Sequence, residues 1–179
     1  MKKLSMILPL ALILCFMVGC QDKEAMAELE EFKAQAAVEE QNIELIKSFF
    51  EVVTGDVEKM RDYYGPDTVY YNPSGRSDPT PGDEDIEETK VFVGAFPDLS
   101  VNIEEIYAVD NKVIARLMTE GTQVGELEGF PTPGNTYKIS SIYIFTIKDG
   151  KIVEIRADAD MLGFYQQLGM ELKPKEEEK

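Results

Sequence analysis

The sequence contains no histidine, no tryptophan and only two cysteines among its 179 residues. The absence of histidine excludes a Ser-His-Asp triad, a Cys-His pair and a histidine-ligated zinc site. Two cysteines are too few for a disulfide-rich scaffold. Basic residues are also scarce, 18 against 34 acidic ones, which gives a formal net charge of −16. Because binding to phosphates needs Lys and Arg to displace counterions, this balance argues against a nucleic-acid partner.

The chain opens with a basic and then apolar segment that is typical of a bacterial export signal. Lys2 and Lys3 precede an apolar run over residues 4–18 that only a serine and a proline interrupt. This run is shorter than the roughly 20 apolar residues that span a bilayer. It ends at Val18-Gly19-Cys20, which resembles the lipobox of bacterial lipoproteins.

The lipobox resemblance implies that residues 1–19 are a signal peptide and that cleavage leaves a lipid-modified Cys20 at the new N-terminus. Acyl chains on Cys20 would anchor the protein in the lipid bilayer, on the extracytoplasmic side of the bacterial cell envelope. Gln21, which is not aspartate, favours the outer membrane in a cell that has two membranes. The alternative is an ordinary secreted protein with a cysteine at its cleavage site by chance.

Three segments follow the predicted signal peptide. Residues 20–41 are rich in Glu, Ala and Lys, which predicts an acidic tether, helical or partly disordered. Residues 42–172 carry the regular patterns of one folded domain, and residues 173–179 form a charged tail.

Helical patterns dominate the first half of the domain. Apolar residues recur at helical spacing over 43–53, and a second short helix is predicted over 57–64. Thr80 is the expected N-cap of a third helix, with Pro81 at its first position and acidic residues 83–85 in its first turn. The helix dipole accounts for these acidic residues, and the spacing is not that of a calcium loop, so no metal is expected. The sequence also has no Gly-rich phosphate-binding loop, and no cofactor is expected.

Sheet patterns dominate the second half of the domain, where Asp149-Gly150 is a typical two-residue hairpin turn and residues 161–168 form a last short helix. Helices followed by an antiparallel meander predict an α+β domain. The predicted strands cover residues 68–71, 99–103, 112–119, 137–147 and 151–160.

Four short motifs occur in order along the domain. They are Ala95-Phe96-Pro97-Asp98-Leu99, Gly121-Thr122-x-x-Gly125-Glu126-x-x-Gly129, Asp149-Gly150-Lys151-Ile152-Val153-Glu154, and Asp160-x-Leu162-Gly163 followed by Gln166-Gln167-Leu168-Gly169. On these motifs, residues 43–172 resemble the SnoaL-like polyketide cyclases, also called ester cyclases, of the nuclear-transport-factor-two-like superfamily. The resemblance implies a cone-shaped α+β barrel, in which N-terminal helices close a pocket over a curved antiparallel sheet.

The resemblance also implies a catalytic residue. Family members that close a ring by intramolecular aldol chemistry use an aspartate as acid and base, and Asp160 stands at the matching motif position. The chain departs from the family at Gln123, where a histidine is common, and at Arg156, where a tryptophan is common.

The strand over 151–160 predicts the surroundings of Asp160. Strict alternation puts five residues on one face, with Asp158 and Asp160 roughly 7 Å apart. They are Ile152, Glu154, Arg156, Asp158 and Asp160. Two carboxylates this close raise one pKa if they are partly buried, whereas the neighbouring arginine opposes that shift. The alternative is a solvated face of charged residues with no role in a site.

The same reasoning predicts a mouth that binds a small-molecule ligand or substrate. The charged residues of this mouth could instead form surface ion pairs, and its aromatic residues could instead pack in the core. Either Tyr70 or Tyr71 could supply the hydroxyl group. The residues expected to bind the ligand are Asp158, Arg156, Arg116, Gln123, Tyr143 and Tyr71.

Three functions fit these observations. The first is a membrane-anchored domain that binds a small, largely apolar molecule and moves a proton through Asp160 in a cyclase, isomerase or hydratase step. The second is the same pocket used for binding without chemistry, favoured by the missing histidine. The third is an interaction module that forms a homodimer through the outer face of the sheet.

Overall fold

The computed structural model describes residues 4–127, 129–130, 134–171 and 173, with side chains from Lys23 onward. The side chain of Cys20 and nearly all of the predicted charged tail therefore lie outside the described residues. The chain divides into two units, Met1–Val38 and Glu39–Lys179, and each is considered by itself.

Helix α1 (Leu4–Val53) supplies the backbone of the first unit and continues into the second. Between Lys23 and Val38 every described side chain is exposed, so none of them packs into a core. Within the described part of the chain, no helix is long and apolar enough to cross a membrane.

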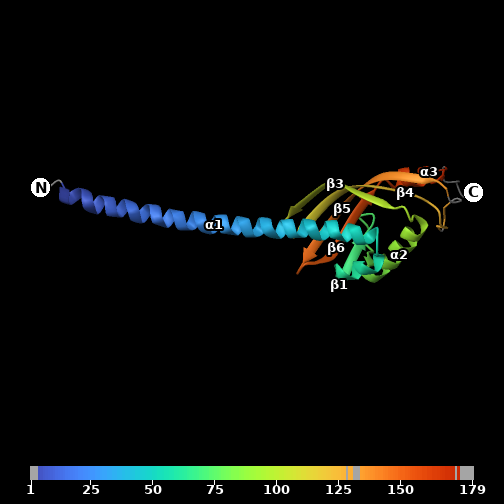
Figure 1. Ribbon diagram of the computed structural model, residues 1–179, viewed down its shortest axis with the longest axis horizontal. Helices are drawn as coiled ribbons and strands as arrows, with labels where there is room; N and C mark the ends of the chain where they lie inside the picture. The colour runs from blue at the N-terminus through green and yellow to red at the C-terminus, as the bar shows by residue number, and fades with distance from the viewer. Residues whose placement is uncertain (1–3, 128, 131–133, 172, 174–179) are drawn as a thin grey trace, which may run out of the picture. The chain divides into compact units, whose positions relative to one another are not determined.

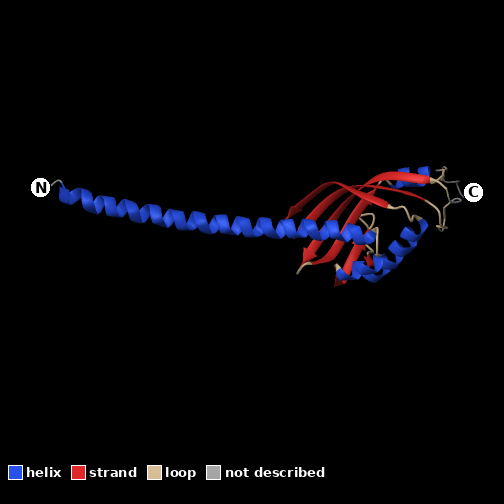
Figure 2. Cartoon of the chain, viewed as in Figure 1, coloured by secondary structure: helices blue, strands red, loops and turns tan. Residues whose placement is uncertain are grey.

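The second unit is built on a six-stranded curved sheet in the order β2-β1-β6-β5-β4-β3 (Figures 1 and 2). The expected antiparallel meander is confirmed by strands β3 (Ser100–Val109), β4 (Lys112–Thr122), β5 (Thr136–Lys148) and β6 (Lys151–Ala159). Strand β1 (Tyr64–Tyr71) pairs with β6 in parallel, so the sheet is mixed and not antiparallel throughout. The sheet does not close on itself.

The turn between β5 and β6 is the one that the sequence predicts. Asp149 and Gly150 have φ angles of 51° and 70°, the left-handed values that a two-residue hairpin turn needs. Residues with short polar side chains or none tolerate these angles best, so the dipeptide fixes the register of the hairpin.

The second short helix is shorter than predicted, and the strand that follows it begins earlier than predicted. Residues Val57–Asp62 form a 3-10 helix, after which Tyr64 already begins β1, so Gly65-Pro66 lies inside the strand. The β1–β6 register shifts between Tyr64 and Val69, which accommodates the proline in an irregular stretch of the strand.

Thr80 is not a helix cap. Thr80–Pro81 forms the short strand β2, which pairs with Val69 and Tyr70 of β1. Helix α2 (Gly82–Ala95) begins one residue later than expected, with no side-chain cap. The pairing with β1 competes with the capping role of Thr80 and prevails because the threonine is almost fully buried there.

Strand β6 departs from strict alternation. The β5–β6 register shifts between Thr146 and Ile147, so Ile152 and Ile155 are both buried although their parity differs. Beyond the shift, Ile155 and Ala157 face the core, and the charged residues that alternate with them, Glu154, Arg156 and Asp158, face outward.

Aromatic side chains attach the helices to the concave face of the sheet. The last turns of α1 and helix α2 cover this face (Figure 1). Phe49 and Phe50 of α1 each contact the ring of Phe145 on β5, at centroid distances of 5.9 and 5.7 Å. A second aromatic group joins Phe96, Tyr137 and Phe164 at the end of the sheet where α3 (Met161–Gln167) lies.

Replacing Phe145 with alanine is expected to destabilise the domain by about 3–5 kcal/mol, because the ring is fully buried between α1 and the sheet. Denaturant unfolding followed by circular dichroism measures this loss. Tyr107→Ala, at a side chain that is 59% exposed on β3, serves as the control and should change stability by less than about 1 kcal/mol. Equal losses in the two variants would contradict the placement of Phe145.

Candidate functional site

A cavity of about 510 Å³ lies between the concave face of the sheet and the helices that cover it. This volume is within the range of small-molecule sites. Strand β5 contributes alternate residues to the wall, as the period of a strand requires. These are Tyr137, Ile139, Ser141 and Tyr143. The wall is mostly apolar and aromatic, so the cavity suits a largely apolar molecule.

Asp85 is the buried carboxyl group of this wall. It lies in the first turn of α2, and only 6% of the residue is exposed. The hydroxyl of Tyr64 donates a hydrogen bond of 2.5 Å to Oδ2 of Asp85. Thr89 and Phe92 continue the same side of α2 along the cavity, at the spacing of one helix face.

Burial changes the acidity of Asp85. Loss of solvation raises the pKa of this carboxyl from 3.8 to about 6, the hydrogen bond from Tyr64 opposes the rise, and the negative charge of Glu88 adds to it. The protonated and ionised forms of Asp85 are therefore both accessible near neutral pH. A carboxyl group in this state is suited to take up and release a proton.

Three tyrosine hydroxyls extend the polar part of the cavity. Burial raises the pKa of Tyr64, Tyr70 and Tyr143 above the ordinary value, so all three stay neutral over the physiological range. Tyr70 and Tyr143 lie close enough to affect each other's pKa, and the side chain of Asn72 lowers the pKa of Tyr70. These hydroxyls are polar anchors for a ligand that is otherwise surrounded by apolar side chains.

Tyr137 lines the cavity, but its hydroxyl is buried and not exposed to the cavity. The residue is only 2% exposed, and within the described structure its hydroxyl has no hydrogen-bond partner. A buried hydroxyl without a partner is unfavourable by about 1–3 kcal/mol.

Asp160 stands in the chain between Ala159 and Met161, which both line the cavity, but it is not itself one of the lining residues. Its side chain is exposed and caps helix α3, because Oδ1 accepts a hydrogen bond of 2.8 Å from the backbone N–H of Gly163. A Cβ atom at Gly163 would stand 2.2 Å from Oδ2 of Asp160. The Asp-x-Leu-Gly motif thus forms a helix cap in which the glycine leaves space for the Asp160 carboxylate.

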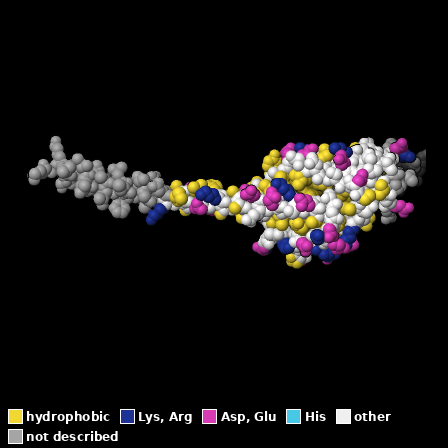
Figure 3. All heavy atoms as spheres, in the orientation of Figure 1, with side chains coloured by type: hydrophobic (Ala, Val, Ile, Leu, Met, Phe, Trp, Pro, Cys, Tyr) yellow, Lys and Arg dark blue, Asp and Glu magenta, His cyan; other side chains and the backbone are white. Residues whose placement is uncertain are grey.

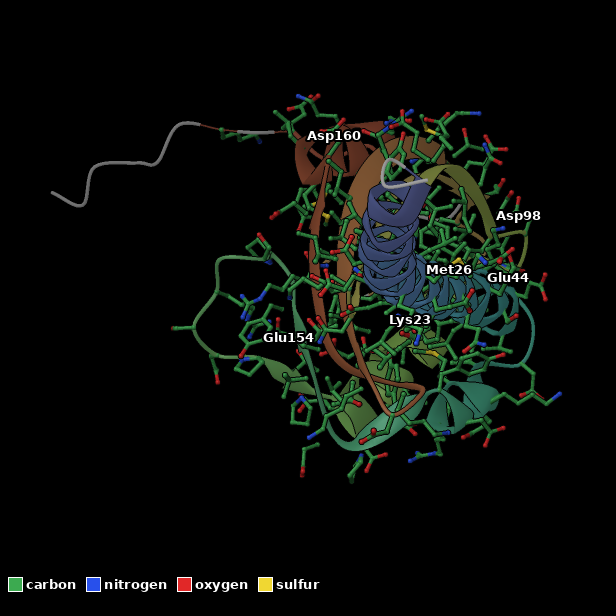
Figure 4. The ribbon with its side chains drawn as sticks, turned by 90° about the vertical axis from the view of Figure 1, so that its left-hand side faces the viewer. Lys23, Met26, Glu44, Asp98, Glu154 and Asp160 are labelled. Atoms are coloured by element: carbon green, nitrogen blue, oxygen red, sulfur yellow. The ribbon has the colours of Figure 1, made fainter. Side chains whose placement is uncertain are left out.

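The other charged residues of β6 lie on the outer face of the strand, away from the cavity. Arg156 donates to Glu154 and, at 2.8 Å, to the carbonyl oxygen of Ser74, and its guanidinium lies 3.9 Å from the ring centre of Tyr71. Asp158 accepts hydrogen bonds from the backbone and hydroxyl of Ser74. Figure 4 shows Glu154 and Asp160 at separate points, the aspartate beside α3. This group holds the segment after β1 against the sheet.

The remaining predicted binding residues are divided between the cavity and other places. Tyr143 lines the cavity, and Tyr70 does so in place of Tyr71. Arg116 forms ion pairs with Glu104 and Glu105 on the outer face of the sheet. Charged side chains of both signs are spread over the surface shown in Figure 3. Gln123 is fully buried, outside the cavity wall, and donates to the carbonyl oxygen of Gly125 at 3.2 Å.

Asp85 was missed because the sequence interpretation assigned residues 83–85 together to the helix dipole. Asp83 and Glu84 are exposed, as that interpretation requires, but Asp85 is buried. The signal in the sequence was its position one residue before Ile86 and four before Thr89, on the face of α2 that packs inward. Among the described residues, no group of three or more acidic or cysteine side chains could hold a metal ion.

Comparison with known proteins agrees with this architecture. The family model described as SnoaL-like polyketide cyclase matches residues 43–168. The chain belongs to this family. The crystal structure described as a SnoaL-like polyketide cyclase from Jannaschia sp. CCS1 superimposes with a TM-score of 0.67 at 22% identity, over 75% of this chain and 95% of that chain. At that identity the likeness concerns the fold alone.

Two curated relatives are named as cyclases. The aklanonic acid methyl ester cyclase DauD of Streptomyces sp. (strain C5) is 31% identical over 112 residues, which are 62% of this chain and 66% of DauD. The aklanonic acid methyl ester cyclase DnrD of Streptomyces peucetius is 32% identical over 110 residues, 60% of this chain and 72% of DnrD. The chain thus spans just under two thirds of DauD.

The raised pKa of Asp85 predicts how stability depends on pH. The folded protein holds this proton more tightly than the unfolded chain, so the contribution of Asp85 to stability is greatest below pH 4 and falls as the pH rises through about 6. Relative to Asp85→Asn, the wild type should lose about 2–3 kcal/mol between pH 4 and pH 7. Urea unfolding at several pH values measures the difference.

Asp83→Asn is the control for this measurement, because it removes an exposed carboxylate from the same helical turn. A stability difference between wild type and Asp85→Asn that is the same at pH 4 and pH 7 would contradict the assigned burial of the Asp85 carboxyl.

Proposed function

We propose that this domain binds a small, largely apolar molecule in its cavity and closes a ring in it by moving a proton. The observation that best supports this proposal is the cavity, whose apolar wall holds a buried carboxyl group and several neutral hydroxyls. An intramolecular aldol step needs a base for a carbon acid and a hydrogen-bond donor for the developing oxyanion. The family and the named reaction of DauD and DnrD support this class of chemistry.

The family resemblance implies an acid–base role for Asp160, and we retain this role as a proposal. Its position in the chain between two residues of the cavity wall supports access to a bound molecule. Its role as helix cap is a second reason for an aspartate at this place. Asparagine also caps helices, so Asp160→Asn removes the acid–base function and keeps the cap.

Aklanonic acid methyl ester is the compound to test first, because it is named for both relatives. We expect the purified domain to convert it to a product of unchanged mass and altered chromatographic retention, since aldol ring closure is an isomerisation. Ala159→Phe, which fills the cavity from β6, should abolish conversion. Ile142→Phe adds a ring to the outer face instead and should not affect conversion.

The outcomes of this assay separate the candidate functions. Conversion that survives Ala159→Phe would exclude the cavity as the site. Binding of the ester without conversion would favour a carrier or sensor, which the lack of histidine also favours. Loss of conversion in Asp160→Asn at an unchanged melting temperature would support Asp160 as acid and base, and unchanged conversion would leave it as a helix cap.

The sequence of the first 20 residues supports a second proposal, that the domain is anchored to a membrane through a lipid on Cys20. Two or more acyl chains hold a protein stably in a bilayer. In the native bacterium the protein should enter the detergent phase of a Triton X-114 separation, and mass spectrometry should find acyl groups on an N-terminal Cys20. Cys20→Ser should move it to the aqueous phase. A mature protein without lipid would contradict the anchor.

A homodimer through the outer face of the sheet stays a prediction. Four apolar side chains that are at least 40% exposed support it, and they lie on strands β3, β4 and β5. They are Tyr107, Val109, Ile114 and Ile142.

A further inference from the structure

Asp85 and Tyr64 lie outside all four sequence motifs of the family resemblance. They face the cavity, they are buried, and they are hydrogen bonded to each other. We propose that Asp85 is the base that takes a proton from carbon in the bound substrate, and that Tyr64 is the positioning residue that orients its carboxylate. This inference rests on the proposed function and assigns its proton transfer to Asp85 instead of Asp160, so Asp160→Asn should keep conversion and Asp85→Asn should lose it.

The geometry supports a base at this place. Oδ2 of Asp85 is held by the Tyr64 hydroxyl, which leaves Oδ1 as the oxygen available to a ligand. Phe49 and Met60 contribute apolar wall on the same cavity. An apolar wall strengthens a carboxylate base, because proton uptake removes a buried charge. It also excludes water that would otherwise compete for the carboxylate.

The step is balanced with no added reagent. The Asp85 carboxylate takes a proton from the carbon next to a carbonyl group, and the electron pair left on that carbon forms the new C–C bond to a second carbonyl carbon. The oxygen of that second carbonyl becomes an alkoxide and takes the proton back from the Asp85 carboxyl. The substrate gains one C–C bond and one hydroxyl group and loses one carbonyl group.

The charges around Asp85 set the pH at which it can act. Tyr64 and Tyr70 face it from β1, Tyr143 faces it from β5, and Glu88 lies one turn further along α2. The three hydroxyls stay neutral because burial raises the pKa of each, and Glu88 adds a like charge. Burial and Glu88 raise the pKa of Asp85 to about 6, so its basic form should dominate above that pH.

The Kemp elimination of 5-nitrobenzisoxazole tests this base without the natural substrate. A carboxylate removes the proton on carbon 3, the N–O bond breaks, and the phenolate product absorbs visible light. We expect the wild-type domain to catalyse the reaction with a rate that rises as the pH passes about 6. Asp85→Asn should lower kcat/KM by about 100-fold or more, whereas Asp83→Asn, an exposed position in the same turn, should leave it unchanged.

Tyr64→Phe tests orientation in a protein that keeps Asp85. The hydrogen bond from Tyr64 lowers the pKa of Asp85, so its removal should move the midpoint of the rate profile to higher pH. A purely structural role of Tyr64 would lower the rate at every pH and leave the midpoint in place. This measurement stays decisive if Asp85→Asn fails to fold.

The outcomes distinguish this inference from the proposed function. No Kemp elimination in the wild type, an undiminished rate in folded Asp85→Asn, or loss of the rate in Glu88→Gln with Asp85 intact would each overturn the role of Asp85. Kemp elimination that depends on Asp85, together with no conversion of aklanonic acid methyl ester, would retain the base and reject that ester as substrate.

Discussion

The domain depends on how its curved sheet is covered. A sheet exposes one apolar face that other elements must bury, and here the cover is made by aromatic side chains at two separate places. Phe49 and Phe50 of α1 reach Phe145, whereas Phe164 of α3 reaches Tyr137 and Phe96. The space between the two groups is not filled, and residues from both line the cavity. The cavity therefore follows from the same packing that stabilises the fold.

The motifs that carry the family resemblance mainly hold this framework together. Asp98 accepts a hydrogen bond of 2.7 Å from the backbone of Thr122, which joins the segment after α2 to the end of β4. A Cβ atom at Gly125 would stand 3.0 Å from the Cα of Ala95, so glycine allows the close approach of these two segments. Asp160 and Gly163 form the helix cap described above. The side chains that give the cavity its polar character stand outside the motifs, and they are Asp85, Tyr64, Tyr70 and Tyr143.

This division explains what the sequence could predict. The meander, the Asp149-Gly150 turn and the last helix follow from local patterns, and local physics decides them. The two faces of β6 cannot be predicted from local patterns, because a register shift of one residue beside Ile147 reverses which side chains point inward. Strict alternation placed Ile152 and Arg156 on one face, whereas the strand buries Ile152 and turns Arg156 outward. The prediction that Thr80 caps a helix is wrong for a related reason, because the pairing of Thr80 with β1 decides its structure.

Asp85 has an acidity close to that of the histidine side chain that the sequence lacks. Imidazole is the usual proton carrier near neutral pH because its pKa is near 6.5. Burial in an apolar wall brings the pKa of the Asp85 carboxyl to about 6, close to that value. The two groups differ in charge, since the basic form of a carboxyl is an anion and that of imidazole is neutral. Taking up a proton therefore removes a buried charge from this wall, so the energy that opposes ionisation in the empty cavity favours proton transfer from a bound carbon acid.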